Sequence, residues 1–132
     1  MAGGEVSRGR QRRVFLDFVG CRLNQAEIEQ AGRQFAARGD AISAGAADAD
    51  LVIINTCAVT HEAARKSRQM IRQAGRANPG ARIVATGCYA ELEPEALARL
   101  PGVAQVIGNA DNERIAALVR DGEADYEREP IQ

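Results

Sequence analysis

The chain has 132 residues and a formal net charge of −1, with 45% hydrophobic and 27% charged residues. This length suits one compact domain, and the composition excludes a disordered, collagen-like or disulfide-stapled chain. No apolar run is long enough for a membrane span or a secretory signal, so the sequence predicts a cytoplasmic protein whose three cysteines are thiols.

Charge is concentrated at the two ends of the sequence. Residues 1–13 carry four Arg against one Glu, whereas residues 121–132 carry five acids against one Arg. The body between them is neutral, which excludes the broad basic surface of a stand-alone nucleic-acid binder. We expect residues 1–13 to form a flexible leader, residues 14–120 a folded domain, and residues 121–132 an acidic linker.

Strands and helices are predicted to alternate along the folded part. The first strand, 14–19, is rich in β-forming residues. A helix follows, with Asn24 as its expected N-cap, Glu27 completing a capping box, and Leu23 packing on Ile28. The other predicted strands cover 41–43, 51–55, 82–86 and 103–107, and the other predicted helices cover 61–76, a short segment opened by Pro94, and 111–120.

This alternation predicts parallel βαβ units with right-handed crossovers. The expected fold class is therefore α/β, a three-layer, doubly wound (flavodoxin-like), mostly parallel sheet.

Each of the three cysteines follows a predicted strand. Cys21, Cys57 and Cys88 thus stand at carboxyl ends of strands, which share one edge of a parallel sheet, so residues far apart in sequence can converge there. Each also precedes a predicted helix, whose amino end favours a thiolate over a thiol. Three thiolates suit a soft metal or an iron–sulfur cluster.

Other interpretations of the cysteines stay open. Free cysteine is often an inert core residue. A structural zinc needs four ligands, and only His61 offers a fourth, without a close pair of cysteines. Nucleophilic catalysis would need the same His61 as a base. No glycine-rich nucleotide motif follows a strand.

Three cysteine motifs carry a resemblance to a known family. They are Gly-Cys-Arg-Leu-Asn-Gln at 20–25, Asn-Thr-Cys-Ala-Val-Thr at 55–60, continued by Arg-Lys-Ser-Arg-Gln at 65–69, and Thr-Gly-Cys-Tyr-Ala at 86–90. Together they resemble the N-terminal domain of radical-SAM methylthiotransferases. The wording is most similar to the branch that modifies N6-threonylcarbamoyladenosine beside the tRNA anticodon.

The resemblance implies that Cys21, Cys57 and Cys88 hold one auxiliary [4Fe–4S] cluster, whose open iron handles the sulfur that becomes the methylthio group. The family's CxxxCxxC motif, which binds a second cluster and allows S-adenosylmethionine to be cleaved, is not in this sequence. The resemblance therefore implies a first domain that is inactive alone and monomeric. Its expected partners are tRNA and the missing radical-SAM and RNA-binding domains, with no membrane partner.

Two further groups of residues are candidates for supporting roles. Four polar residues near the cysteines could hydrogen-bond the sulfurs, although turns and helix caps would also explain them; these are Asn24, Asn55, Thr56 and Thr60. Four arginines on one stripe of the 61–76 helix could dock tRNA or the missing domain, unless they form a solvated face; these are Arg65, Arg68, Arg72 and Arg76. The alternative function is a non-catalytic flavodoxin-like binding module with core or zinc-binding cysteines.

Overall fold

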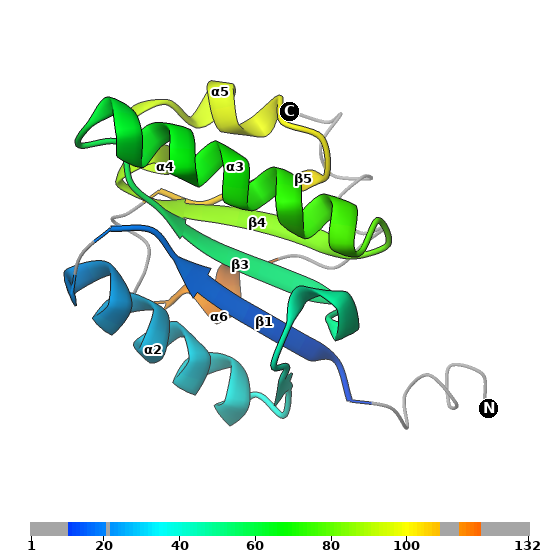
Figure 1. The fold of residues 1–132 in the computed structure, drawn as a ribbon. Helices are drawn as coiled ribbons and strands as arrows, with labels where there is room; N and C mark the ends of the chain where they lie inside the picture. The colour runs from blue at the N-terminus through cyan, green and yellow to red at the C-terminus, as the bar shows by residue number, and fades with distance from the viewer. Residues whose placement is uncertain (1–10, 21, 109–113, 120–132) are drawn as a thin grey trace, which may run out of the picture.

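The computed structural model describes residues 11–20, 22–108 and 114–119. Its centre is one sheet of five parallel strands in the order β2-β1-β3-β4-β5 (Figure 1). The strands are β1 (Arg13–Phe18), β2 (Ala41–Ile42), β3 (Leu51–Thr56), β4 (Arg82–Gly87) and β5 (Val103–Val106). The predicted parallel sheet is confirmed, and each predicted strand is present to within a few residues.

Helices cover both faces of this sheet. On one face lie α2 (Arg22–Ala37) and α6 (Ile115–Leu118), and on the other lie α3 (His61–Ala77), α4 (Cys88–Leu92) and α5 (Pro94–Ala98) (Figure 1). A short 3₁₀ helix, η1 (Ala46–Asp48), precedes β3. The arrangement is the three-layer, doubly wound, flavodoxin-like fold expected from the alternation of strands and helices.

The central strand β3 is buried along its whole length. Its continuous apolar run lets alternate side chains enter the two cores, since successive residues of a strand point to opposite faces. Ile54 packs in the core under α3, where Ile71 is fully buried, and Ile53 packs in the core under α2, where Phe35 is fully buried. The strand β3 is therefore packed between two layers of helices along its whole length.

The start of α2 differs from the predicted one. The helix begins at Arg22, so Asn24 lies inside it and is buried rather than acting as its N-cap. Gly20 adopts a φ of +110°, which turns the chain abruptly after β1 and lets the helix start earlier. Leu23 is 62% exposed, so the expected packing of Leu23 on Ile28 is wrong.

The first strand and the last helix also have other bounds than the predicted ones. The folded part extends before residue 14, because Arg13 opens β1, Arg12 forms an ion pair of 2.8 Å with Asp40, and Gln11 donates to Gly39 O at 2.9 Å. At the other end, α6 stops at Leu118, not at residue 120. The first part of that predicted helix, 111–113, the remainder of the leader and the acidic linker lie outside the described residues. In the described ranges, no helix combines the length and the apolar character needed to cross a bilayer.

Candidate cysteine site at the carboxyl edge of the sheet

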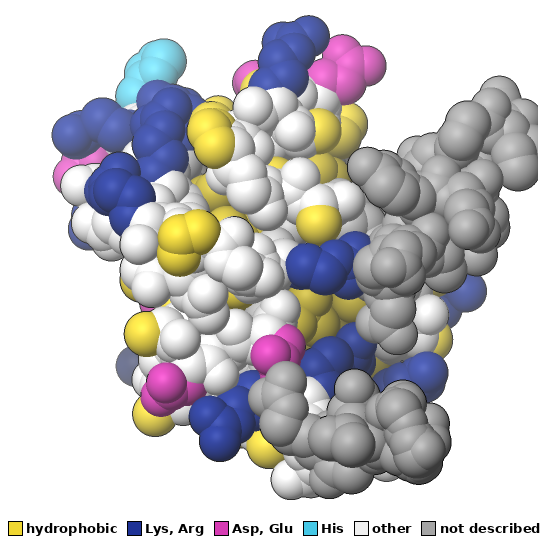
Figure 2. All heavy atoms as spheres, turned by 90° about the vertical axis from the view of Figure 1, so that its right-hand side faces the viewer, with side chains coloured by type: hydrophobic (Ala, Val, Ile, Leu, Met, Phe, Trp, Pro, Cys, Tyr) yellow, Lys and Arg dark blue, Asp and Glu magenta, His cyan; other side chains and the backbone are white. Residues whose placement is uncertain are grey.

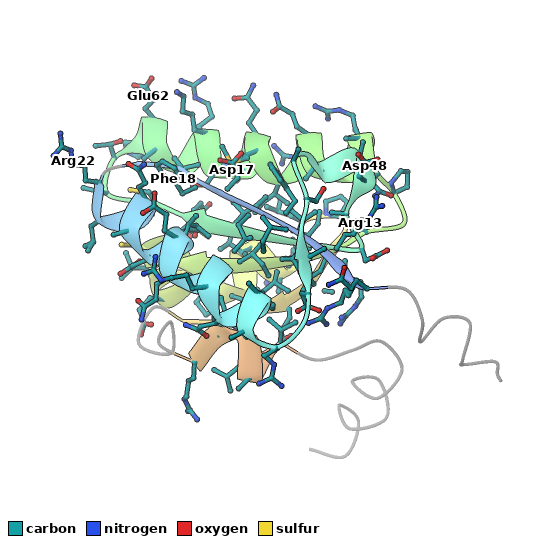
Figure 3. All side chains as sticks on the ribbon, turned by 90° about the horizontal axis from the view of Figure 1, so that it is seen from below. Arg13, Asp17, Phe18, Arg22, Asp48 and Glu62 are labelled. Carbon is teal, nitrogen blue, oxygen red and sulfur yellow. The ribbon has the colours of Figure 1, made fainter. Side chains whose placement is uncertain are left out.

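Strands β1, β3 and β4 are neighbours and end at the same level. Phe18 pairs with Asn55, and Asn55 pairs with Thr86, so the three strands finish together. Figure 3 shows Phe18 and Arg22 at this end of the structure and Arg13 at the opposite end. Cys57 and Cys88 directly follow the adjacent strands β3 and β4, as the sequence predicts.

Cys57 is held by Ser67, a residue of the 65–69 motif to which the sequence alone assigned no role at the site. Its backbone N–H donates to Ser67 Oγ at 3.0 Å, and Ser67 Oγ donates to Cys57 O at 3.1 Å. Ser67 is fully buried on the inner face of α3, and Cys57 is 8% exposed. One hydroxyl therefore satisfies both backbone polar groups of Cys57 and ties the end of β3 to α3. A small polar residue on the apolar side of α3 was the signal that could have identified Ser67.

The segment that leads to Cys21 lies against Cys57. A Cβ on Gly20 would lie 3.4 Å from Cys57 Sγ and 3.0 Å from Asn24 Nδ2. The Nδ2 amide of Asn24 donates a hydrogen bond to Val19 O, so this buried side chain closes the turn after β1. Cys21 itself lies outside the described residues, and the predicted convergence of all three sulfurs stays a prediction. The chain that carries Cys21 nonetheless approaches Cys57 closely.

Cys88 is half-buried and is the first residue of α4. The residue before it, Gly87, has a φ of +97° and a ψ of −167°, a combination that essentially only glycine adopts. A Cβ on Gly87 would overlap Asn55 Oδ1 and the backbone of Thr56. The Gly-Cys order at 87–88 therefore lets the end of β4 pack directly against the residues that precede Cys57.

The side chain of Asn55 is hydrogen-bonded to a carboxylate from α2. Its Nδ2 donates to Glu27 Oε1 at 3.1 Å, which is the role of Glu27 here in place of the predicted capping box. Asn55 Oδ1 is buried without a hydrogen-bond partner in the described part of the chain. Thr56 donates its hydroxyl hydrogen to Thr86 O at 2.6 Å, so that donor is already used.

Thr60 is the N-cap of α3. Its hydroxyl accepts from the N–H of Ala63 at 3.0 Å, and its side chain is exposed. Of the four polar residues predicted near the cysteines, the structure thus gives each a local structural contact: Asn24 closes a turn, Asn55 binds Glu27, Thr56 joins two strands, and Thr60 caps a helix.

The four arginines of α3 do not act alike. Arg68 is half-buried and donates from Nη1 to the hydroxyl of Tyr89 at 2.9 Å, while Arg65, Arg72 and Arg76 are exposed. Tyr89 is buried and follows Cys88 in α4. Ser67 and Arg68, consecutive in α3, therefore hold the two segments that carry Cys57 and Cys88.

An apolar rim follows the three cysteine positions in sequence. Leu23, Val59 and Leu92 are large hydrophobic residues that are 62%, 77% and 68% exposed, and they lie just after the ends of β1, β3 and β4. All three therefore follow the strands that end at the cysteine edge.

The donor set fits a soft metal or an iron–sulfur group. Cysteine sulfurs at adjacent strand ends are soft ligands, and the absence of a side chain at Gly20 leaves space beside Cys57 Sγ. Among the described residues, no three His, Cys, Asp or Glu side chains are grouped for a metal ion, and Cys21 is not among those residues. His61 is exposed at the start of α3.

Comparison with known structures agrees with the fold. A response regulator from Burkholderia pseudomallei, solved with a phosphorylated aspartic acid, superimposes with a TM-score of 0.61 over 89% of this chain and 72% of its own. Its sequence identity is 17%, so the similarity concerns the fold alone.

Comparison with curated proteins points to one group of enzymes. The chain is 38% identical over 109 residues to the threonylcarbamoyladenosine tRNA methylthiotransferase MtaB of Aquifex aeolicus, covering 83% of this chain and 27% of that protein. The Bacillus subtilis protein of the same name is 38% identical over 118 residues, covering 89% and 26%. The ribosomal protein uS12 methylthiotransferase RimO of Roseiflexus castenholzii is 36% identical over 108 residues, covering 81% and 22%.

The chain thus spans about a quarter of the length of the curated relatives that it matches. A family model described as "Uncharacterized protein family UPF0004" matches residues 13–108, which include all three cysteines and the whole sheet. The chain belongs to this family, the N-terminal domain of methylthiotransferases.

Proposed function

We propose that this chain is the auxiliary-cluster domain of a tRNA methylthiotransferase that adds a methylthio group to N6-threonylcarbamoyladenosine beside the anticodon. In this proposal Cys21, Cys57 and Cys88 hold one [4Fe–4S] cluster through three thiolates. The observation that carries it is the placement of Cys57 and Cys88 at the ends of adjacent strands, with Gly20, the residue before Cys21, against Cys57 Sγ.

When bound, such a cluster would supply an open iron for the sulfur that becomes the methylthio group. The chain's own residues prepare the site. Ser67 holds the backbone of Cys57, and Arg68 holds Tyr89 beside Cys88, so the two thiols are presented from fixed backbones. Gly87 allows these two segments to approach each other without a side chain between them.

The apolar rim supports the proposed domain partner. Leu23, Val59 and Leu92 would be covered by the radical-SAM domain of the full-length enzyme, which would carry the second cluster and bind S-adenosylmethionine. Burying these side chains would exclude water from the cysteine edge. tRNA would be the substrate of the complete enzyme, and the domain alone would be a monomer in the cytoplasm.

Anaerobic reconstitution with iron and sulfide tests the cluster directly. We expect about one [4Fe–4S] cluster, and so about four iron atoms, per chain. The reconstituted chain should show the absorbance and the reduced-state EPR signal of an iron–sulfur protein. Each of Cys21→Ala, Cys57→Ala and Cys88→Ala should lose the iron, because two thiolates do not hold a cuboidal cluster in water. His61→Ala is the control and should retain it.

Three outcomes would contradict the proposal. Full iron with an unchanged spectrum in one Cys→Ala variant would make that cysteine a core residue. Loss of metal in His61→Ala, with zinc rather than iron bound to the wild-type chain, would favour a four-ligand zinc site. A chain that takes up neither metal would favour a non-catalytic binding module.

A further inference from the structure

The outer side of α3 carries a row of three exposed arginines, Arg65, Arg72 and Arg76, here named the arginine row. At 100° per residue these positions fall within an arc of about 40° on one side of the helix. At 1.5 Å per residue they span about 16 Å. Figure 2 shows Lys and Arg side chains gathered beside the histidine, and the single histidine of the chain is His61, the first residue of α3.

This helix is the most basic of the described helices and strands. It contains five Lys and Arg against Glu62, a local charge of +4 in a chain of net charge −1. Within the described part of the chain, Arg72 and Arg76 form no ion pair. Arg68 is excluded from the row because it is turned toward Tyr89. The row therefore presents uncompensated positive charge.

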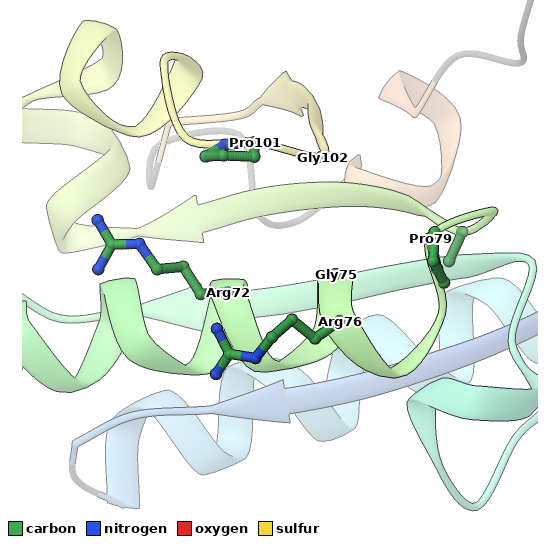
Figure 4. A pocket seen from close by; sticks show the side chains of 7 residues that line it. Arg72, Gly75, Arg76, Pro79, Pro101 and Gly102 are labelled. Carbon is green, nitrogen blue, oxygen red and sulfur yellow. The ribbon is translucent and has the colours of Figure 1, made fainter.

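A hollow lies at the far end of the row. It has a volume of about 390 Å³ and is flanked by Arg72 and Arg76, with an apolar lining of Gly75, Ala81, Pro101 and Gly102. Figure 4 shows it between α3 and the Pro101–Gly102 segment, with both guanidinium groups directed toward the amino end of α3. Its lining includes no carboxylate, and its apolar surface is made of small or flat side chains.

We propose that the arginine row and this hollow bind the sugar–phosphate backbone of an RNA strand. Guanidinium groups bind phosphate in a two-pronged geometry, and most contacts between proteins and nucleic acids go to phosphates. The flat lining by glycine and proline leaves room for a sugar or base beside the phosphates. This inference rests on the proposed function, to which it adds the surface that holds the RNA.

The direction of α3 supports an RNA strand over another partner. The helix begins four residues after Cys57 and ends at the hollow, so the row leads away from the cysteine edge. At about 3.4 Å of helix axis per nucleotide, a row of about 16 Å follows roughly five nucleotides. A protein partner would need large apolar anchors, but Leu23, Val59 and Leu92 lie at the cysteine edge instead.

The test measures binding of a fluorescently labelled RNA stem–loop to the full 132-residue chain at increasing salt concentrations. We expect Arg72→Gln/Arg76→Gln to weaken binding about tenfold at low salt, and to lower the slope of log K against log salt by about one to two. The matched control is Arg33→Gln/Arg38→Gln, which removes the same charge from an exposed position of α2 and from the exposed residue that follows its last turn, away from α3.

The control should bind within about twofold of wild type, because it lies away from the row. Equal losses in the two double variants would reduce the effect to net charge and overturn the proposal. It would also be overturned if a synthetic acidic peptide bound the row while the RNA did not. Circular dichroism of each variant ensures that only folded proteins are compared.

Two sets of samples separate this inference from the proposed function. Binding is measured on the chain both without and with reconstitution, because the row does not include a cysteine. A chain that binds no iron but shows the arginine dependence overturns the cluster and supports the RNA surface. A chain that binds iron but shows no arginine dependence overturns the RNA surface alone.

Discussion

Single residues decide how closely the strand ends approach each other at the cysteine edge. Gly87 combines a φ of +97° with a backbone packed on Thr56, and Gly20 combines a φ of +110° with a contact to Cys57. Gly39 also has a positive φ, of +97°, but a Cβ there would meet nothing within 4 Å. Gly45 is extended, with a φ of −155°, and is equally open. Substitution by alanine would therefore meet both backbone strain and steric overlap at Gly87, backbone strain alone at Gly39, and neither at Gly45.

Replacement of Gly87 by alanine should therefore be the most damaging of the three matched substitutions. We expect Gly87→Ala to lower the free energy of unfolding by more than about 3 kcal/mol, because strain and overlap with Asn55 add. Gly39→Ala should cost about 1–2 kcal/mol from strain alone, and Gly45→Ala should lie within about 1 kcal/mol of wild type. Urea denaturation measures all three. A Gly87→Ala cost no larger than that of Gly39→Ala would contradict the close packing described.

At the scale of elements, α3 connects the site to the rest of the fold. It begins at the cap Thr60, binds Cys57 through Ser67 and Tyr89 through Arg68, and packs Ile71 into the core. After its last turn, Asn78 donates to three carbonyl oxygens around η1, those of Ala46, Ala47 and Ala49. Both ends of the helix are therefore tied to neighbouring segments, and its inner side sets the position of the cysteine-bearing loops.

The cap offers a test that separates a structural hydroxyl from one that serves a cluster. Thr60→Ala should lower the free energy of unfolding by about 1 kcal/mol, because the N–H of Ala63 loses its acceptor. Thr60→Ser should restore most of it. Iron content and the EPR spectrum of the reconstituted chain should be the same in all three proteins. A changed spectrum in Thr60→Ala with unchanged stability would instead assign the hydroxyl to the sulfurs.

At the scale of the whole molecule, the sheet separates the cysteine site and the hollow, which lie toward its two opposite edges. The carboxyl edge carries Cys57, Cys88 and the exposed residues Leu23, Val59 and Leu92, and the hollow beside Pro101 lies toward the other edge. Two cores, one on each face, keep these regions in a fixed relation. The chain matches about a quarter of the length of its curated relatives.

The reconstituted chain alone should not cleave S-adenosylmethionine. Its sequence lacks the CxxxCxxC motif expected to hold the second cluster, and its only cysteines are the three assigned to the auxiliary one. The measurement is the amount of 5′-deoxyadenosine formed under reducing, anaerobic conditions, compared with a reaction without protein. Formation above that background, lost in Cys57→Ala, would show that the auxiliary site performs the cleavage itself.

The amino-acid sequence by itself determined the alternation of strands and helices, the buried strand 51–55 and the position of each cysteine shortly after a predicted strand. These features depend on local patterns of apolar residues and on the connectivity of parallel sheets, which act over short stretches of chain. The position of Pro94 at the start of α5 was predicted for the same reason. The cysteine motifs also carried the family resemblance, which the match over residues 13–108 confirms.

Only the tertiary structure decided which polar and charged side chains meet. Asn24 was predicted to be a helix cap but lies buried within α2. Ser67 is hydrogen-bonded to Cys57, ten residues away in the sequence. Arg68 is hydrogen-bonded to Tyr89 and does not share the exposed side of the other three arginines. A capping pattern is compatible with several helix starts, and here the positive φ of Gly20 selects one of them. Contacts between separate elements depend on how the helices pack on the sheet, which the periodicity of a single segment does not contain.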